Sequence, residues 1–365
     1  MSAVPGLVVR EGTCHAILAF DVGREIRVED AARILGAAPT PPAGPGRPPY
    51  LQFARPPVRC TIRTPAVSID GRSTREDATI VLFEFGAAAV VFTLDATGTF
   101  DDLARLGSAL SGTEVLAAAA RALVGDVVTR LGSAIDDPHL ASVVEEYLVF
   151  HACSAESDVP VAQWPVTFAA DLARVLRAEP RSLSDQEIAQ TLAAPAAYTP
   201  DDLVLVDWNA AFVARDRADD LLAVFIFANV QLLEMRFLDA RLDEALQRSY
   251  DGVQVVERRD RIFPTAHRGA LDAVARRQID AALLFEHVRN APKLLGDQYL
   301  ARVYEHAARR FRLADWDDAI HRKLEVLGTI YERIRDRAAI VRAEVLEWII
   351  ILICVVSIVV PFLVP

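Results

Sequence analysis

The chain has 365 residues, which is enough for two domains of ordinary size, and its formal net charge of −11 argues against a general nucleic-acid-binding protein. Its four cysteines are scattered with no Cys-x-x-Cys pair, so a disulfide framework and a zinc site are both disfavoured and a reducing cytoplasm fits. The apolar run near the N-terminus is too short for a secretory signal, and we expect neither a metal nor a cofactor.

The first hundred residues show strand patterns with one short helix. Apolar alternation predicts a strand over residues 14–23, a short helix follows it, and the Pro- and Gly-rich stretch 38–50 predicts a loop or lid. Further strands are predicted over 58–69 and, on either side of Gly86, over 78–95. The N-terminal half is therefore expected to be rich in β-structure.

Helices and strands then alternate up to about residue 215. Residues 100–131 are helical with an interruption near Gly112, and 163–179 predicts another helix. The β-branched and aromatic residues of 143–154 favour a strand, with a helix as the alternative, and 203–214 predicts a strand or hairpin. Together these patterns predict an α+β unit.

The second half is helical. Residues 218–251 contain neither Pro nor Gly and predict one long helix, and two more helices are predicted over 276–290 and 298–313. The expected fold class is α+β, with a mixed α/β head, a long helical stalk and a single C-terminal transmembrane helix. The expected domains are a head (1–215), a coiled-coil-like stalk (216–345) and an anchor (346–365).

Apolar residues of the stalk recur at alternating steps of four and three, a period of 3.5 that predicts a packing seam. Such a seam needs a partner, which is either the 218–251 helix of the same chain, folding back as a hairpin, or the same helix of a second subunit. We favour the intrachain partner, with a homo-oligomer built on top of it. The seam residues are Ile320, Leu324, Leu327, Tyr331, Ile334, Ala338 and Val341, continuing through Val345 to Trp348.

The last eighteen residues, 348–365, carry no charge. As a helix they would extend roughly 27 Å, close to one hydrocarbon core. Trp348 has the position of an interfacial aromatic, and the arginines before it predict, by the positive-inside rule, a tail-anchored protein of the inner (cytoplasmic) membrane with its N-terminal part in the cytoplasm. A buried C-terminal helix of a soluble core is the alternative. The proposed anchor residues are Trp348, Ile349, Ile350, Ile351, Leu352 and Ile353.

The membrane-proximal part is basic. Residues 258–342 contain 18 Arg or Lys against 12 Asp or Glu, which leaves the remainder of the chain strongly acidic. Such a segment can contact an anionic membrane surface or, on weaker grounds, the ribosome or RNA. A solvated helical face with interleaved acids is the alternative interpretation.

The usual catalytic motifs are not present. There is no Gly-x-x-x-x-Gly-Lys, His-Glu-x-x-His or Gly-x-Ser-x-Gly, so we expect no catalytic, cofactor-binding or metal-binding residues. The nearest approach to a site is the set Cys14, His15, His151 and Cys153 in the head, which an enzyme would use. On a strand His151 and Cys153 would share a face, but two ligands do not make a metal site.

Charged residues of the long helix form polar stripes that we interpret as docking positions. Buried against the head, such pairs would fix how the helix docks on the sheet; a ligand site is the alternative. The cluster Asp207, Trp208 and Asn209 could bind a protein partner, although a capped turn is the preferred interpretation. The docking residues are Glu234, Arg236, Asp239, Arg241 and Asp243.

Three segments resemble the family called "required for meiotic nuclear division", also known as domain of unknown function 155. They are the ending Leu346-Glu347-Trp348 with the isoleucine-rich run after it, the turn within LFEFGAAAVVF (82–92), and LLEMRFLDARLDEAL (232–246). The resemblance implies a membrane-anchored protein whose mitochondrial relatives are associated with the inner membrane and with organellar translation. It implies no catalytic residues.

The expected function is therefore a membrane-anchored scaffold or tether and not an enzyme. It would display a cytoplasmic α+β domain and recruit a protein or ribonucleoprotein partner of unknown identity. The alternative is an enzyme with an unrecognised site in the α+β head.

Overall fold

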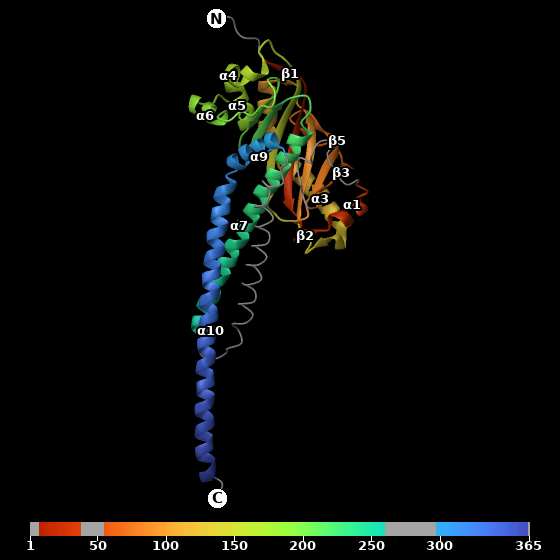
Figure 1. Ribbon diagram of the computed structural model, residues 1–365. Helices are drawn as coiled ribbons and strands as arrows, with labels where there is room; N and C mark the ends of the chain where they lie inside the picture. The colour runs from red at the N-terminus through yellow and green to blue at the C-terminus, as the bar shows by residue number, and fades with distance from the viewer. Residues whose placement is uncertain (1–6, 38–54, 260–296, 364–365) are drawn as a thin grey trace. The chain divides into compact units, whose positions relative to one another are not determined.

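The computed structural model describes residues 7–37, 55–259 and 297–363, and it shows a mixed α+β protein with one large sheet (Figure 1). The described residues form two compact units, of which the first holds the sheet. The predicted loop 38–50 and the predicted helix 276–290 lie outside the described residues. The first unit contains residues 7–37, 55–237 and 297–314, and the second contains residues 238–259 and 315–363.

The first unit holds nearly all the regular elements. Its strands are β1 (Val8–Asp21), β2 (Glu25–Ile26), β3 (Val58–Arg63), β4 (Ser68–Ile69), β5 (Arg72–Leu82), β6 (Ala87–Asp95), β7 (Gly98–Thr99), β8 (Ile135–Asp136), β9 (Glu145–Glu156), β10 (Leu203–Val206) and β11 (Ala210–Ala214). Its helices are α1 (Val28–Leu35), α2 (Phe100–Leu110), α3 (Glu114–Leu131), α4 (Trp164–Thr167), α5 (Ala169–Arg177), α6 (Asp185–Thr191) and α9 (Gln298–Arg310).

Two long helices extend from the first unit into the second. Helix α7 spans Asp219–Arg259 and helix α10 spans Leu313–Leu363. The domain boundary predicted at residue 216 lies close to the start of α7, whereas the compact units divide inside that helix, after Phe237. The long helix predicted over 218–251 is confirmed, and it continues further than its sequence pattern indicated.

Among the described residues, nine strands form the main sheet in the order β10-β11-β9-β1-β6-β5-β3, with β4 paired to β5 and β7 paired to β1. Neighbouring strands are antiparallel except β11 and β9, which are parallel. The long strand β1 lies between β9 and β6, and its register with β9 shifts at a bulge near Glu11. The β1 strand therefore brings residues from distant parts of the sequence onto shared faces.

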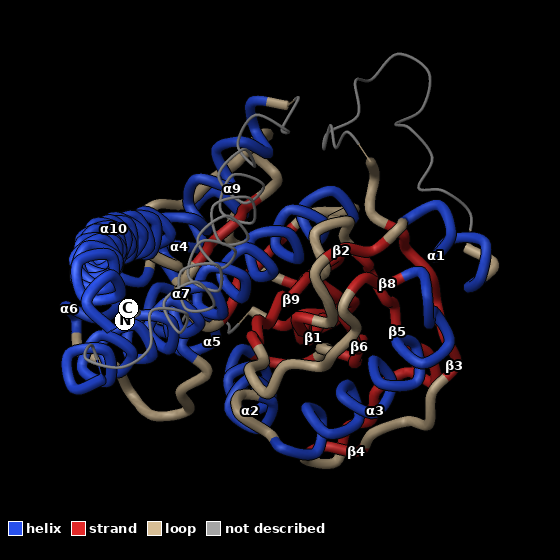
Figure 2. Tube along the Cα trace, turned by 90° about the horizontal axis from the view of Figure 1, so that it is seen from below, coloured by secondary structure: helices blue, strands red, loops and turns tan. Residues whose placement is uncertain are grey.

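One face of the sheet carries the main hydrophobic core. The β1 side chains Cys14, Ala16, Leu18 and Phe20 are at most 2% exposed, because they alternate toward this face. Their core includes apolar residues of α1, α2, α3 and α5, and Figure 2 shows helices α1, α2 and α3 lying along this side of the strands. The apolar faces of the strands and of the helices in the N-terminal half are thus buried together in one hydrophobic core.

Helix α7 covers part of the opposite face. Its Phe225 ring lies 5.9 Å from the Tyr147 ring of β9, and its Asn229 side chain donates a hydrogen bond to the Glu145 carbonyl at 3.0 Å. Tyr147 also makes an edge contact with Phe311, just after α9, with ring centroids 5.0 Å apart. Because the sheet buries it, the first part of α7 is apolar on nearly every side.

In the second unit, α7 and α10 pack along one another. Lys323 Nζ of α10 lies 2.7 Å from Oδ1 of both Asp239 and Asp243 of α7. The buried side chains beside this contact include Leu242 of α7 and Leu327 of α10. The expected contact with the 218–251 helix of the same chain is therefore present. In Figure 1 the colours of the two helices run in the same direction, so they are parallel neighbours and the expected hairpin geometry is wrong.

The described residues include one helix that is long and apolar enough to cross a membrane, Asp219–Arg248, and 83% of its apolar stretch is buried inside the protein. The C-terminal stretch Leu346–Val356 counts only as a shorter apolar helix. A core helix of a soluble protein passes the same test as a membrane span. The coarse α+β fold is therefore confirmed, and the C-terminal membrane helix remains a proposal.

Candidate functional site: the histidine face of the sheet

Two histidines lie close together on the α7 side of the sheet, beyond the part covered by Phe225. The register pairs Thr13 with His151 across β1 and β9, and it pairs His15 with Thr93 across β1 and β6. Side chains two residues apart on a strand share a face, so all four point to the same side. We call these four residues the histidine face.

His15 is held by hydroxyl groups on both sides. Its Nε2 lies 3.1 Å from the Thr13 hydroxyl, and its Nδ1 lies 3.2 Å from the Thr93 hydroxyl. Burial lowers the pKa of His15 to about 4, with further lowering by His151 and by arginines, whereas Asp219 opposes the shift. His15 is therefore neutral at physiological pH, with one ring nitrogen donating and the other accepting.

His151 is oriented by the backbone and by a cysteine. Its Nε2 donates to the Arg215 carbonyl at 2.8 Å. Cys153 Sγ lies 3.6 to 3.7 Å from the ring nitrogens. Burial raises the pKa of the Cys153 thiol, and Glu11 and Asp216 raise it further. This environment disfavours the thiolate that a nucleophilic cysteine requires.

Cys14 does not belong to this group. Its side chain is fully buried in the helix-covered core on the other face, and burial raises the pKa of its thiol strongly. The four residues suggested as an enzyme site are thus divided between the two faces, because Cys14 and His15 alternate along β1. Among the described residues there is also no group of three His, Cys, Asp or Glu side chains arranged to hold a metal ion.

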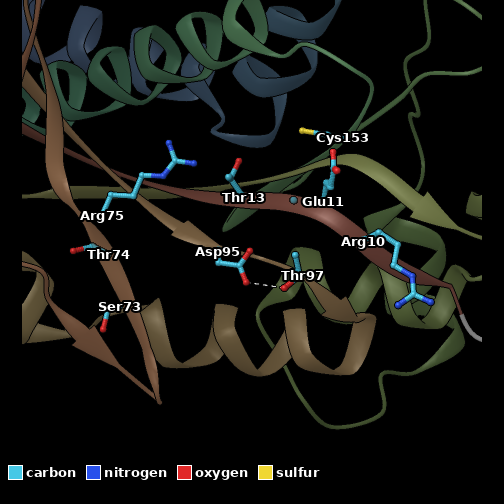
Figure 3. A pocket seen from close by; sticks show the side chains of 10 residues that line it. Arg10, Glu11, Thr13, Ser73, Thr74, Arg75, Asp95, Thr97 and Cys153 are labelled. Atoms are coloured by element: carbon cyan, nitrogen blue, oxygen red, sulfur yellow. Dashed lines mark hydrogen bonds between the residues drawn. The ribbon is translucent and has the colours of Figure 1, made fainter.

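A pocket of about 450 Å³ opens at this end of the sheet. Figure 3 shows the Arg75 guanidinium, Thr13, Glu11 and Cys153 directed to the same side of the strands. Within the described residues Arg75 makes neither an ion pair nor a hydrogen bond. Sequence reasoning missed Arg75, since its proximity to β1 depends on the strand order β1-β6-β5.

The predicted docking residues lie on both units. Arg236 Nη1 is 2.5 Å from Oε1 of Glu145 on β9, so this residue joins helix and sheet within the first unit. Glu234 is fully buried, and Arg241 is exposed. Asp239 and Asp243 contact Lys323 on α10 rather than the sheet. The proposal that these charges select the docking geometry stays a prediction.

The seam residues are partly described. Ile320 and Leu327 are 0% and 1% exposed, and Leu324 is half-buried. Ile330, which the 3.5-residue pattern did not include, is also buried. The side chains of the later seam residues Tyr331, Ile334, Ala338 and Val341 lie outside the described set.

The proposed anchor residues are exposed. Trp348 is 71% exposed and Ile351, the best covered of the six, is 44% exposed. Leu346, Val355 and Val356 are exposed as well. Large apolar side chains therefore face outward around the whole circumference of this part of α10.

The turn between β10 and β11 holds a buried ion cluster. Asp207 is 1% exposed, and its carboxylate lies 2.9 Å from Arg177 Nε and 3.4 Å from Arg310 Nη1. Burial raises the pKa of Asp207, whereas both arginines lower it. Asn209 donates to the Arg177 carbonyl at 3.2 Å, while Trp208 is 54% exposed. The two arginines are distant in sequence, so no local pattern indicated this cluster.

The sequence matches the model of a known protein family. The model described as "Uncharacterized protein MJ0711, N-terminal domain" matches residues 11–220. A similar curated protein is the uncharacterized protein MJ0711 of Methanocaldococcus jannaschii, 22% identical over 190 residues. That alignment covers 52% of this chain and 58% of the relative, so the chain spans less than two thirds of it. No solved structure matches.

These findings overturn the resemblance to the "required for meiotic nuclear division" family. The matched region contains the turn of residues 82–92 but ends before 232–246 and before the Leu346-Glu347-Trp348 ending. A turn between two strands and an apolar helix after a charged one recur in unrelated proteins, since both follow from general packing and membrane rules. The translation-related role rested on that resemblance alone and falls with it.

Proposed function

Because the chain belongs to the family of the MJ0711 N-terminal domain, for which the comparison names no activity, we propose its function from the structure alone: a membrane-anchored scaffold or tether. The end of α10 enters the membrane, and the first unit is displayed for a protein partner. The exposed apolar side chains of Leu346–Val356 carry this proposal.

The exposed surface is too apolar to remain in water. Full burial of one Leu, Ile or Val side chain is worth about 1.5 to 3 kcal/mol. Since the affected side chains are roughly half exposed, their transfer into lipid gains on the order of 10 kcal/mol in total. They are Leu346, Trp348, Ile349, Ile350, Ile351, Leu352, Ile353, Val355 and Val356.

The backbone of this segment suits a bilayer. Helix α10 continues without a break to Leu363, so residues 346–363 form a rod of about 27 Å with its hydrogen bonds satisfied internally. Pro361 lies in the last turn, where the loss of one hydrogen bond matters little. Trp348 marks one interface, and the nearby Arg342 supports placing the preceding residues on the cytoplasmic side.

Helix α7 is the competing candidate for a membrane span. It is long and apolar enough to span, but 83% of its apolar stretch is buried, and its Asn229 and Arg236 contact strand β9. Inserting it would remove those contacts and expose the face of the sheet. The sheet therefore accounts for the hydropathy of α7, whereas no described residue covers the end of α10.

Charge substitution tests the tether. Each Asp placed at the centre of a membrane helix costs about 2.5 to 3.5 kcal/mol, so the double variant Ile350→Asp and Ile353→Asp should release the protein into the soluble fraction after alkaline extraction. The matched control, Val115→Asp with Val166→Asp, alters two exposed valines of the first unit and should leave it in the membrane pellet.

Two results would each refute the tether. If the tail variant and the control distribute alike, with both folded by circular dichroism, the apolar end of α10 does not hold the protein in a membrane. If wild-type protein is soluble without detergent and elutes as an oligomer, contacts between copies cover this surface and the tether is refuted.

An enzyme is the alternative class of function. Its most specific observation is the contact of Cys153 with His151. The raised pKa of that thiol works against nucleophilic catalysis, so we propose no enzymatic activity.

A further inference from the structure

The two edges of the main sheet are closed to different extents. At the β10 edge, Ala196 exchanges backbone hydrogen bonds with Val204 at 2.9 and 2.7 Å, and Arg310 donates to the Val206 carbonyl at 3.1 Å. At the other edge, β3 makes backbone hydrogen bonds only to β5 within the described residues. The β3 edge therefore offers unpaired backbone groups to an incoming strand.

The register of β3 with β5 shows which groups these are. Thr64 lies opposite Glu76 in the continuation of this pairing, and its N–H donates to the Glu76 carbonyl at 3.1 Å. Hydrogen-bonded and non-hydrogen-bonded pairs alternate along an antiparallel ladder, so the even-numbered residues of β3 bond to β5. The N–H and C=O groups that point away from the sheet belong to Arg59, Thr61 and Arg63.

The side chains of these three residues are exposed on the face of β3 that is turned away from the main core. Arg59 lies opposite Val81 on β5, so it has no acid across the strand pair. Arg63 lies opposite Asp77, but the two form no ion pair within the described residues. This face of the edge thus carries two arginines against one carboxylate.

The other face of β3 is apolar. Cys60 and Ile62 are half-buried and pack against the main core. Helix α1 packs against β3, and Figure 2 shows it beside this strand. Because side chains alternate along a strand, an added strand would present one set to the arginines and the other set to this apolar face.

The charges on β3 disfavour a second copy of the chain as the occupant. Pro57 and Pro65 bound the strand, but its six residues contain neither a proline nor a bulge, so backbone geometry does not block pairing. In a full antiparallel overlap of two β3 strands, each Arg59 would lie opposite an Arg63, and like charges directly opposite are destabilising. The same charges attract an acidic strand.

We propose that the β3 edge binds an acidic, extended segment of a protein partner by strand addition. The segment lies antiparallel to β3, since antiparallel pairing is slightly the more stable and β3 pairs with β5 in this way. Its acidic residues, four positions apart, lie opposite Arg59 and Arg63, and its apolar residues lie on the face of Cys60 and Ile62. The inference deepens the proposed function, on which its biological role rests, by giving the chemistry of the recruited partner.

A fluorescein-labelled peptide, Gly-Glu-Val-Thr-Val-Glu-Gly, tests the edge by fluorescence anisotropy with the full-length protein in a maltoside detergent. We expect saturable binding that the double variant Arg59→Glu with Arg63→Glu weakens about tenfold or more. The peptide Gly-Lys-Val-Thr-Val-Lys-Gly should bind this variant better than it binds wild type, which a merely structural effect of the substitutions would not produce. The matched control, Arg181→Glu with Arg309→Glu, changes two exposed arginines outside β3 and should bind the acidic peptide as wild type does.

N-methylation of the peptide separates strand addition from simple charge attraction. In the proposed pairing the N–H of the peptide threonine faces β3, whereas the N–H of each peptide valine faces away. N-methylation of the threonine should therefore abolish binding, and N-methylation of a valine should leave the affinity largely unchanged.

The tail variant Ile350→Asp with Ile353→Asp should bind the acidic peptide as wild type does, so the docking edge and the membrane anchor are tested independently. No saturable binding, equal affinity of the edge variant and the control, or equal affinity of the two N-methylated peptides would overturn the inference. A dimer of the protein that the acidic peptide dissociates would overturn it as well, because a second copy would then occupy β3.

Discussion

The ion cluster at the β10–β11 turn offers the sharpest test of how the first unit is held together. Arg310 of α9 donates to the Val206 carbonyl at 3.1 Å, the Gln190 carbonyl at 2.7 Å and the Thr191 carbonyl at 2.9 Å. It also lies 3.4 Å from the buried carboxylate of Asp207. One side chain therefore joins α9 to the end of β10 and to the end of α6.

We expect Arg310→Met to destabilise the protein by about 3 kcal/mol. A hydrogen bond to a charged group contributes about 1.5 to 3 kcal/mol, and three are lost, but water can replace those at the partly exposed end of α6. Methionine retains the packing of the aliphatic stem, so the loss reports on the polar contacts. Urea unfolding followed by tryptophan fluorescence measures the difference.

A matched control separates this cluster from ordinary surface charge. Arg33 pairs with Asp30 on α1 and is 76% exposed, so Arg33→Met should change stability by less than about 0.5 kcal/mol. The double variant Asp207→Asn with Arg310→Met should lose less than the sum of the single changes, because the two residues interact. If Arg310→Met is no more destabilising than Arg33→Met, the argument that Arg310 fixes α9 is refuted.

Two further predictions concern the sheet. The pKa of His15 is about 4 in the folded protein and 6.5 in the unfolded chain, so the unfolded chain binds a proton first as the pH falls. The free energy of unfolding should therefore decrease between pH 6.5 and pH 4, by up to about 3 kcal/mol. In urea titrations between pH 7 and 4, His15→Gln should abolish this part of the pH dependence. Gly86 has a φ of +92°, and a Cβ added there would lie 1.8 Å from the Gly23 carbonyl oxygen. Gly71 also has a positive φ, of +77°, but a Cβ added there would point into open space. Gly86→Ala should therefore lower the urea midpoint of unfolding far more than Gly71→Ala.

The sequence predicted local elements well because their signals are local. The strand predicted over 14–23 is part of β1, the turn at Gly86 separates β5 from β6, and the helical interruption at Gly112 separates α2 from α3. Each of these glycines has positive φ, which explains why the chain turns there. Alternation of polar and apolar residues was sufficient to place the strands.

The candidate site was predictable only in part. His15, His151 and Cys153 were identified from the sequence, but Arg75 and Thr13 were not. Their proximity arises from the strand order, which places β9, β1, β6 and β5 side by side although β9 is separated from β6 by about fifty residues of helix and loop. Such non-local pairing has no short-range sequence signature. For the same reason, the sequence did not indicate that Arg177 and Arg310 contact Asp207.

The two apolar helices show why hydropathy alone could not decide the membrane question. Residues Asp219–Arg248 and the end of α10 are both apolar, and the first is the longer. The two helices differ in that α7 has a packing partner from a distant part of the sequence. Strand β9 contributes Tyr147 and Glu145 to the surface on which α7 packs.

No corresponding surface covers the end of α10 among the described residues. With Lys323 opposite Asp239 and Asp243 in parallel helices of equal rise, Arg259 falls opposite roughly residue 341. The described part of α7 therefore ends just before the exposed segment that begins at Leu346. The case for a membrane anchor thus depends on the exposure of residues 346–356 among the described residues, and any element found to cover them in water would replace lipid as the explanation of their apolar character.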